Sequence, residues 1–169
     1  MLNPSGSKVL FTLFNNHLKS HFGDEEANGQ GKVYNDQRRR QQAEKISDIV
    51  AQRMRPDSRY LIVGDMNDAP DAAPLQALLT IEGRPLFNAL AHPQETRPPK
   101  PEAGGHDPQS PAWTHRYKKS GQPPEHRLFD QIWLSPALVP AFRSAWIDRR
   151  TKHGGDGSDH DPAWVEMDI

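Results

Sequence analysis

Polar side chains of the kinds used in phosphoryl chemistry occur at four places along the chain, each beside an apolar segment. They are Asn16 and His17; Asp65 and Asn67; Asp130; and Ser158, Asp159 and His160. A single cluster of this kind is typical of a turn, because Asp and Asn readily hydrogen-bond their own backbone. Four clusters, each next to an apolar segment, instead indicate loops that converge at one rim of a sheet.

These residue types suit the hydrolysis of a phosphate ester with the help of a divalent metal ion. Asp159, Asp65 and the amide oxygen of Asn67 can supply the oxygen ligands that Mg2+, or Mn2+, prefers. His160 can accept a proton from an attacking water if a carboxylate such as Asp130 holds its other ring nitrogen. We therefore predict metal-binding and general-base chemistry at this rim.

The elements that must position these side chains follow from the apolar pattern. Short runs rich in β-branched and aromatic residues predict strands, and apolar residues at helical spacing predict helices. The predicted strands cover residues 8–14, 59–63, 113–117, 129–135, 142–147 and 163–167. One predicted helix begins at Asn35 or Asp36 and runs to Met54, a second runs from Asp71 to Leu79, a third piece covers 86–90, and residues 20–35 form a loop. The order of strand, helix and strand indicates an α/β fold.

The composition indicates one domain with a small core. The chain has 169 residues, of which 34% are hydrophobic and 16 are proline. Many of the prolines lie in residues 91–126, which we interpret as a proline-rich loop inserted in the domain. Loops of this length in a compact domain are commonly binding loops or disordered.

Charge and cysteine content exclude several classes of function. The formal net charge is −1, so no global positive field attracts nucleic acid or anionic lipid, and any such contact must be local. The absence of cysteine excludes disulfides, thiolate zinc sites and a cysteine nucleophile. No apolar run approaches the ~20 residues needed to cross a bilayer. The first residues do not resemble a signal peptide, and nothing in the sequence indicates a cellular location.

Four segments carry a resemblance to a known family. They are NNHLKS at 15–20, IVGDMN at 62–67, FDQIWLS at 129–135 and SDH at 158–160. In this order and spacing they resemble the last four motifs of the endonuclease/exonuclease/phosphatase superfamily, the deoxyribonuclease-I-like metallophosphodiesterases. The resemblance implies the C-terminal half of a four-layer α/β sandwich, with a mostly antiparallel or mixed sheet and flanking helices.

The resemblance also implies a role for each site residue. His17 would contact the scissile phosphate or assist the leaving group. Asp65 and Asn67 would orient the water and the phosphate and bind a cation. Asp130 would support His160, the general base. Asp159 would bind the metal, and the implied substrate is a nucleic acid, a phospholipid head group or a small phosphoester.

The chain also departs from the family pattern. The first half of the family fold contributes an Asn near its first strand and a metal-binding Glu, and neither has a candidate here. We therefore interpret residues 1–169 as a single partial domain that lacks the N-terminal half. This interpretation predicts weaker magnesium affinity, reduced activity and self-association through a sheet left uncovered.

Two other functions compete with hydrolysis by a histidine base. The chain could be a catalytically inactive fragment that acts as a binding module. It could also be a serine hydrolase using Ser158, but Ser158 and His160 are close in sequence and no Gly-x-Ser-x-Gly elbow is present.

Several other polar residues have simpler interpretations. Asp68 and Asp71 are predicted to shape a turn and cap a helix, and the run Arg38, Arg39 and Arg40 to form a solvated helix face. Trp113 and His115 either contact substrate or belong to an ordinary edge strand. The remaining histidines considered, His92, His106 and His126, lack ligand spacing and are predicted to be loop residues.

Overall fold

A computed structural model describes residues 1–2, 4–91, 93–95, 112–117, 120–149 and 157–169 of the chain. The helices are α1 (Gln30–Arg53) and α2 (Gln76–Leu79), with short 3₁₀ turns at Glu26–Gly29, Ala73–Leu75 and Val139–Ala141. The strands are β1 (Thr12–His17), β2 (Tyr60–Asp65), β3 (Thr80–Ile81), β4 (Arg84–Pro85), β5 (Phe87–Asn88), β6 (Gln94–Glu95), β7 (His115–Tyr117), β8 (Glu125–Arg127), β9 (Asp130–Leu134), β10 (Phe142–Ile147) and β11 (Ala163–Met167).

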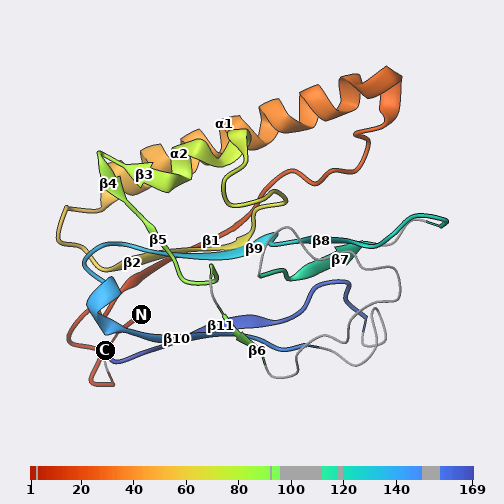
Figure 1. The fold of residues 1–169 in the computed structure, drawn as a ribbon. Helices are drawn as coiled ribbons and strands as arrows, with labels where there is room; N and C mark the ends of the chain where they lie inside the picture. Colours follow the sequence, from red (N-terminus) through yellow and green to blue (C-terminus); the bar gives the residue numbers. More distant parts are fainter. Residues whose placement is uncertain (3, 92, 96–111, 118–119, 150–156) are drawn as a thin grey trace.

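These elements form a helical layer and two stacked sheets (Figure 1). The first sheet has the strand order β1-β2-β9-β5, and the second has the order β11-β10-β6. In the first sheet β1 and β2 are parallel, whereas β9 is antiparallel to β2, so the sheet is mixed as predicted. Helices α1 and α2 cover one face of this sheet, and the second sheet lies over its other face (Figure 1).

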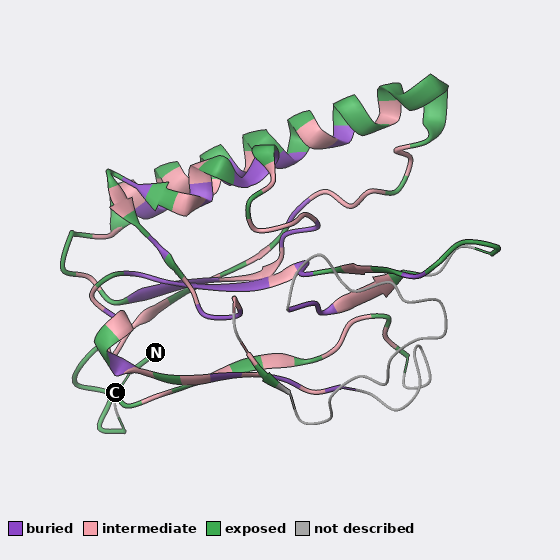
Figure 2. Cartoon of the chain, in the orientation of Figure 1, coloured by how far each residue is buried: buried purple, intermediate pink, exposed green. Residues whose placement is uncertain are grey.

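Two apolar cores hold the layers together. The alternation of side chains along β2 sends Tyr60 and Ile62 toward Ala43 and Val50 of α1. It sends Leu61 to the opposite core, between the two sheets. The buried surfaces accordingly follow the sheets and the inner face of α1, whose outer face is exposed (Figure 2). Within the described residues, no helix is long and apolar enough to cross a membrane.

The start of α1 differs from the prediction. The helix begins at Gln30, so neither Asn35 nor Asp36 caps it. Asn35 is buried inside the helix, and its Nδ2 donates hydrogen bonds to the carbonyl oxygen of Phe22 and to Asp24. Gly31 allows the preceding loop to pack this closely, since a Cβ there would lie 1.8 Å from the carbonyl oxygen of Gly23. This contact is tertiary, so helical periodicity could not reveal it.

Other elements also differ from their predicted form. Residues 86–90 are not helical, because Phe87 and Asn88 pair with β9 as the edge strand β5. The turn before α2 has Ala72 as its N-cap and no side-chain cap, so Asp71 does not cap this turn. The first strand covers Thr12–His17 rather than 8–14. Of the predicted insertion 91–126, residues 91, 93–95, 112–117 and 120–126 are described and include β6, β7 and part of β8.

The expectation of a single, uncovered sheet was wrong. Strands β10 and β11 pair with each other in antiparallel fashion and, with β6, form a second sheet. Ala145 and Ile147 of β10 are buried against Leu61 and Ile132 of the first sheet. The strand positions were predicted correctly, but their assignment to one sheet was not, since local pattern does not determine strand partners.

Strand register brings three of the predicted site residues side by side. In the β1–β2 pair His17 lies opposite Asp65, and in the β2–β9 pair Asp65 lies opposite Asp130. Gly64 permits this arrangement, because a Cβ at its position would lie 1.9 Å from the carbonyl oxygen of Asn16. Neighbouring strands lie ~4.8 Å apart, so the three side chains share one rim of the sheet.

A buried arginine of α1 contacts both the segment after β1 and the loop after β2. The side chain of Arg39 is fully buried and ion-paired with Asp36 and Asp68. Its Nε donates to Asp68 Oδ2 at 3.1 Å, and its Nη1 donates to the carbonyl oxygen of Lys19 at 3.0 Å. Arg39 therefore joins the segment after β1 to the loop after β2. The prediction of a solvated face holds for Arg38 and Arg40, which are exposed, and fails for Arg39.

We expect Arg39→Ala to lower the free energy of unfolding by about 3 kcal/mol, the scale for removing one partner of a buried ion pair. Arg40→Ala, a substitution of the same type on the exposed face, should change it by less than about 0.5 kcal/mol. Urea denaturation of both variants measures the difference. Equal stability of the two variants would show that Arg39 does not hold the loops.

Candidate active site

The loop after β2 holds Asp65 and Asn67 in fixed positions. The backbone N–H of Asn67 donates to Asp65 Oδ1 at 2.9 Å, and Asn67 itself adopts a left-handed conformation with φ of 52°. The Asn67 side chain is buried, and its Nδ2 donates to the carbonyl oxygen of Leu18 at 3.1 Å. His17, at the end of β1, has Nε2 3.6 Å from Asp65 Oδ2 and a side chain that is 73% exposed. The rim thus presents a carboxylate and an imidazole toward solvent.

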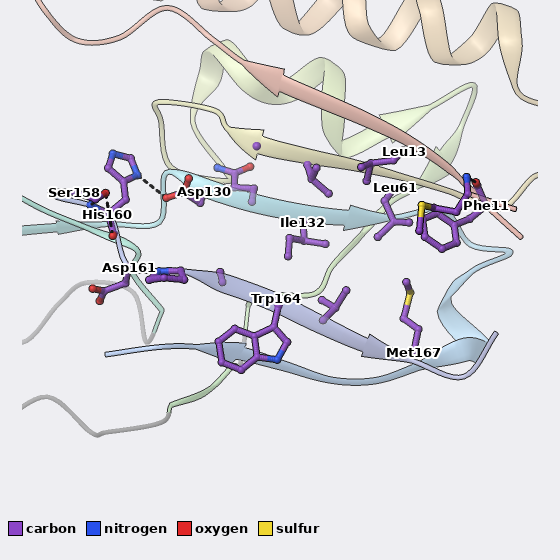
Figure 3. A pocket seen from close by; sticks show the side chains of 17 residues that line it. Phe11, Leu13, Leu61, Asp130, Ile132, Ser158, His160, Asp161, Trp164 and Met167 are labelled. Carbon is purple, nitrogen blue, oxygen red and sulfur yellow. Dashed lines mark hydrogen bonds and ion pairs between the residues drawn. The ribbon is translucent and has the colours of Figure 1, made fainter. Parts of the chain in front are cut away.

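His160 joins this rim from the segment before β11. Its Nδ1 donates to Asp130 Oδ2 at 2.6 Å, an interaction drawn in Figure 3. Its Nε2 lies 4.0 Å from Asp65 Oδ2 and 4.0 Å from Asp159 Oδ1. The imidazole is therefore held at one nitrogen, while the other nitrogen faces two carboxylates.

Hydrogen bonds to the backbone fix the segment that carries His160. The Ser158 hydroxyl accepts from the His160 N–H at 3.1 Å and lies 3.3 Å from the His160 carbonyl oxygen. The hydroxyl thus shapes the turn, which supports a structural role for Ser158 over that of a nucleophile. A backbone bridge between His160 and His115 attaches the same segment to β7.

The surroundings shift the pKa values of the neighbouring His115 and His160 in opposite directions. The hydrogen bond to Asp130 raises the pKa of His160 above its usual value and outweighs the effect of burial. Burial lowers the pKa of His115, and the adjacent His160 lowers it further. Burial would raise the pKa of Asp159, but hydrogen bonding and the nearby His115 and His160 lower it overall. His115 therefore binds a proton less readily than His160 does, and Asp159 favours its ionised form.

His115 belongs to the site, which the sequence left undecided. Its Nε2 lies 3.4 Å from Asp159 Oδ2, and its ring lies 4.8 Å from that of His160. The ring also stacks on Phe129, with centroids 4.9 Å apart. The signal available in the sequence was the alternation in WTHRY, which puts His115 on the same side of its strand as Trp113.

A second buried arginine positions the segment that carries Asp159 and His160. The Arg149 guanidinium lies 3.7 Å from the centre of the Trp113 ring and donates to the Trp113 carbonyl oxygen at 2.5 Å. Its Nη1 also donates to Asp161 Oδ2 at 3.0 Å. The Asp161 N–H in turn donates to the carbonyl oxygen of Thr114 at 2.7 Å. No local pattern identified Arg149 or Asp161, because they act across separate parts of the chain.

The predicted site residues fall into two groups in space. His17, Asp65, Asp130, Asp159 and His160 surround one point at the rim, whereas Asn67 lies beside them with its amide nitrogen bonded to the backbone. Asp68 shapes the loop as predicted, since its Oδ1 accepts from the N–H of Ala69. Of the other histidines considered, His126 packs against Trp113, and His92 and His106 lie outside the described residues.

The donor atoms at the rim suit a divalent cation. Two sets of three side chains have donor atoms within 4.8 Å of one another: Asp65, Asp130 and His160, and His115, Asp159 and His160. Carboxylates from both sets face His160 Nε2, and carboxylate oxygens are the ligands that Mg2+ prefers. Each set therefore offers carboxylate oxygen to a hard cation, from Asp65 and Asp130 in one set and from Asp159 in the other.

An apolar groove runs from this site between the two sheets (Figure 3). Its volume is about 590 Å³, and Asp130 and His160 line one end. The apolar lining comes from Leu13, Leu61 and Ile132 of the first sheet and from Val165 and Met167 of β11. The second sheet thus covers the first sheet only in part.

Three solved structures share this fold at low sequence identity. A 3' phosphatase, NExo, from Neisseria bound to a product DNA hairpin matches with a TM-score of 0.58 and 17% identity. An AP endonuclease from Archaeoglobus fulgidus matches with a TM-score of 0.59 and 15% identity, and the 3'-5' exonuclease NExo from Neisseria meningitidis with 0.57 and 18%. Each match covers 93% of this chain and 61% of the other chain, so this chain spans about three fifths of those structures.

The sequence itself matches a family model over most of its length. A comparison with curated proteins gives no match. The model of the Endonuclease/Exonuclease/phosphatase family matches residues 3–160, and the structural matches agree with the deoxyribonuclease-I-like fold expected for that family. This chain belongs to the endonuclease/exonuclease/phosphatase family.

Proposed function

We propose that the chain carries the base-bearing part of a metal-dependent phosphoester hydrolase. The observation that supports this most directly is the Asp130–His160 hydrogen bond, which leaves His160 Nε2 facing the carboxylates of Asp65 and Asp159. A phosphoester hydrolase needs a positioned base and a group that neutralises phosphate charge. Family membership supports the same class of reaction.

In this proposal His160 Nε2 accepts the proton of the attacking water. Asp130 keeps the Nδ1–H in place and stabilises the imidazolium that forms, as the 2.6 Å hydrogen bond allows. The strong hydrogen bond raises the pKa of His160, which makes the imidazole a better base. Asp130 thus fixes the orientation of the ring that would take up the proton.

The neighbouring residues position the phosphate and the metal ion. Asp159 and Asp65, with Asn67, would hold Mg2+ or Mn2+, which when bound supplies positive charge for the phosphate oxygens. His17 is exposed at the end of β1, 3.6 Å from Asp65, where it can contact the phosphate or the leaving group. These assignments place the nucleophile and the phosphate on the same rim.

DNA is the substrate that we favour among phosphate esters. The matched structures include one bound to a product DNA hairpin and an AP endonuclease, both at low identity. The alternative substrates are a phospholipid head group and a small phosphoester, which carry the same type of phosphate ester. The net charge of −1 provides no global field for DNA, so binding must depend on local contacts at the rim.

We expect His160→Ala to reduce magnesium-dependent turnover by at least ~10²-fold, the scale for losing a general base. Asp130→Asn should reduce it as well, because the amide removes the negative charge that stabilises the imidazolium. Assays with a 3'-phosphorylated DNA hairpin, an abasic duplex and bis(p-nitrophenyl) phosphate measure the effect. His21→Asn, a control outside the cluster, should retain wild-type turnover. Full turnover in His160→Ala would remove His160 from the role of base.

The alternative function is a binding module without catalysis, and magnesium titration separates the two. A hydrolase site should give saturable heat with MgCl2 in calorimetry, and Asp65→Asn combined with Asp159→Asn should abolish it because both carboxylates are lost. Asp71→Asn, at an exposed carboxylate beyond the site, should leave the titration unchanged. A flat titration of the wild-type chain, together with no hydrolysis, would establish the binding module instead.

We also propose that the groove between the sheets supports self-association. Leu13 is 49% exposed on β1, an edge strand of the first sheet, and β11 is an edge strand of the second. Apolar lining and open strand edges on the same groove favour pairing with another copy. Substrate binding at the other end of the groove would then be sensitive to oligomeric state.

Analytical ultracentrifugation tests this proposal. The wild-type chain should sediment as a dimer or larger species, and Leu13→Lys should shift it to a monomer by placing a charge in the groove. Val33→Lys is the matched control, since Val33 is an equally apolar residue, 69% exposed, on α1 away from the groove. A monomeric wild-type protein would contradict the proposal.

A further inference from the structure

A second cluster of donor atoms overlaps the catalytic rim and differs from it in chemistry. His115 Nε2 lies 3.4 Å from Asp159 Oδ2, and His160 Nε2 lies 4.0 Å from Asp159 Oδ1. Donor atoms of these three side chains all lie within 4.8 Å of one another. The set therefore contains two imidazole nitrogens and one carboxylate, whereas a magnesium site consists mainly of oxygen ligands.

We propose that His115, Asp159 and His160 form an inhibitory site for Zn2+ or a similar borderline transition metal ion. Two histidines and one carboxylate with an open fourth position form a ligand set that zinc commonly takes. Tetrahedral zinc with Zn–N distances of about 2.0–2.1 Å places its donor atoms ~3.3 Å apart. His115 Nε2 lies 3.4 Å from Asp159 Oδ2, close to this value, and the three donor atoms lie within 4.8 Å of one another, so side-chain rotations that draw the donors together would complete the site.

The environment of each histidine supports metal binding. The Asp130 carboxylate holds His160 at Nδ1 and leaves Nε2 available, which is the carboxylate–histidine–metal arrangement that orients zinc ligands. His115 stacks on Phe129, with ring centroids 4.9 Å apart, and this contact holds the ring beside Asp159. Asp159 has a side chain that is 64% exposed, which gives an ion access from solvent.

The same geometry indicates a moderate affinity rather than a structural zinc site. His115 Nδ1 is buried and has no hydrogen-bond partner among the described residues, so no carboxylate reinforces this ligand as Asp130 reinforces His160. Loss of such a supporting hydrogen bond typically weakens metal binding by about 10–100-fold. A zinc ion bound with this moderate affinity can dissociate, so its effect on the enzyme would be reversible.

Zinc would inhibit hydrolysis because it needs His160 Nε2, the same nitrogen that acts as the base. The inhibition therefore rests on the proposed function. Zinc bound at His160 Nε2 occupies the lone pair that would accept the proton of the attacking water. It also takes the Asp159 carboxylate, which is a candidate magnesium ligand. Zinc should therefore oppose magnesium-dependent turnover, and added magnesium should compete with it weakly, because Mg2+ does not favour imidazole nitrogen.

Metal titration of the full chain tests the site without relying on activity. ZnCl2 calorimetry should give one saturable site, and Co2+ should give the intense visible absorption of four-coordinate cobalt with nitrogen ligands. His115→Phe keeps the ring that stacks on Phe129 but removes the ligand, so it should weaken zinc binding at least ~100-fold. Thermal unfolding of the variant checks that it is folded.

His21→Phe is the matched control, because His21 also stacks on Phe129, with centroids 5.4 Å apart, but lies outside the cluster. It should bind zinc as the wild type does. Equal zinc affinity in His115→Phe and wild type, or no zinc binding by the wild type, would overturn the proposal.

Turnover measurements separate this inference from the proposed function. If zinc binds through His115 but leaves hydrolysis unaffected, the zinc site stands and His160 is not the base. If hydrolysis requires His160 but zinc binding does not involve His115, the proposed function stands and the zinc site is rejected. Relief of zinc inhibition in His115→Phe would support both.

Discussion

The register of three neighbouring strands is the constraint on which the candidate site depends. His17, Asp65 and Asp130 lie opposite one another on β1, β2 and β9, although they are far apart in the sequence. Gly64 makes this register accessible, because any larger residue would clash with the backbone of β1. Moving one strand by a single residue would turn its site residue to the other face of the sheet. His160 contacts Asp130 and Asp65, so its position in the site depends on this register.

Two buried arginines connect the loops around this row to the scaffold. Arg39 joins the segment after β1 to the loop after β2, and Arg149 joins Trp113, just before β7, to Asp161 in the segment before β11. A buried guanidinium must satisfy several donors, so each arginine fixes several backbone positions at once. The loops that carry the site are therefore anchored by charge and hydrogen bonding as well as by apolar packing.

The position of His160 gives the site two chemical options. Its Nδ1 is bound to Asp130, and its Nε2 faces oxygen donors on one side and the imidazole of His115 on the other. Oxygen donors suit a hard cation and phosphoryl chemistry, whereas the added imidazole suits a softer ion. In the two proposals the hydrogen bond to Asp130 orients this same nitrogen, either to accept a proton or to bind a metal.

The sequence by itself determined the family, the strand positions at 129–135, 142–147 and 163–167, and the residue types of the site, because motifs and apolar periodicity are local properties. It could not assign β10 and β11 to a separate sheet, place the start of α1 at Gln30, or distinguish buried Arg39 from its exposed neighbours. The tertiary structure also decided that His115 lies beside Asp159 and His160. Each of these features depends on contacts between segments far apart in the chain, and such contacts leave no periodic trace in either segment alone.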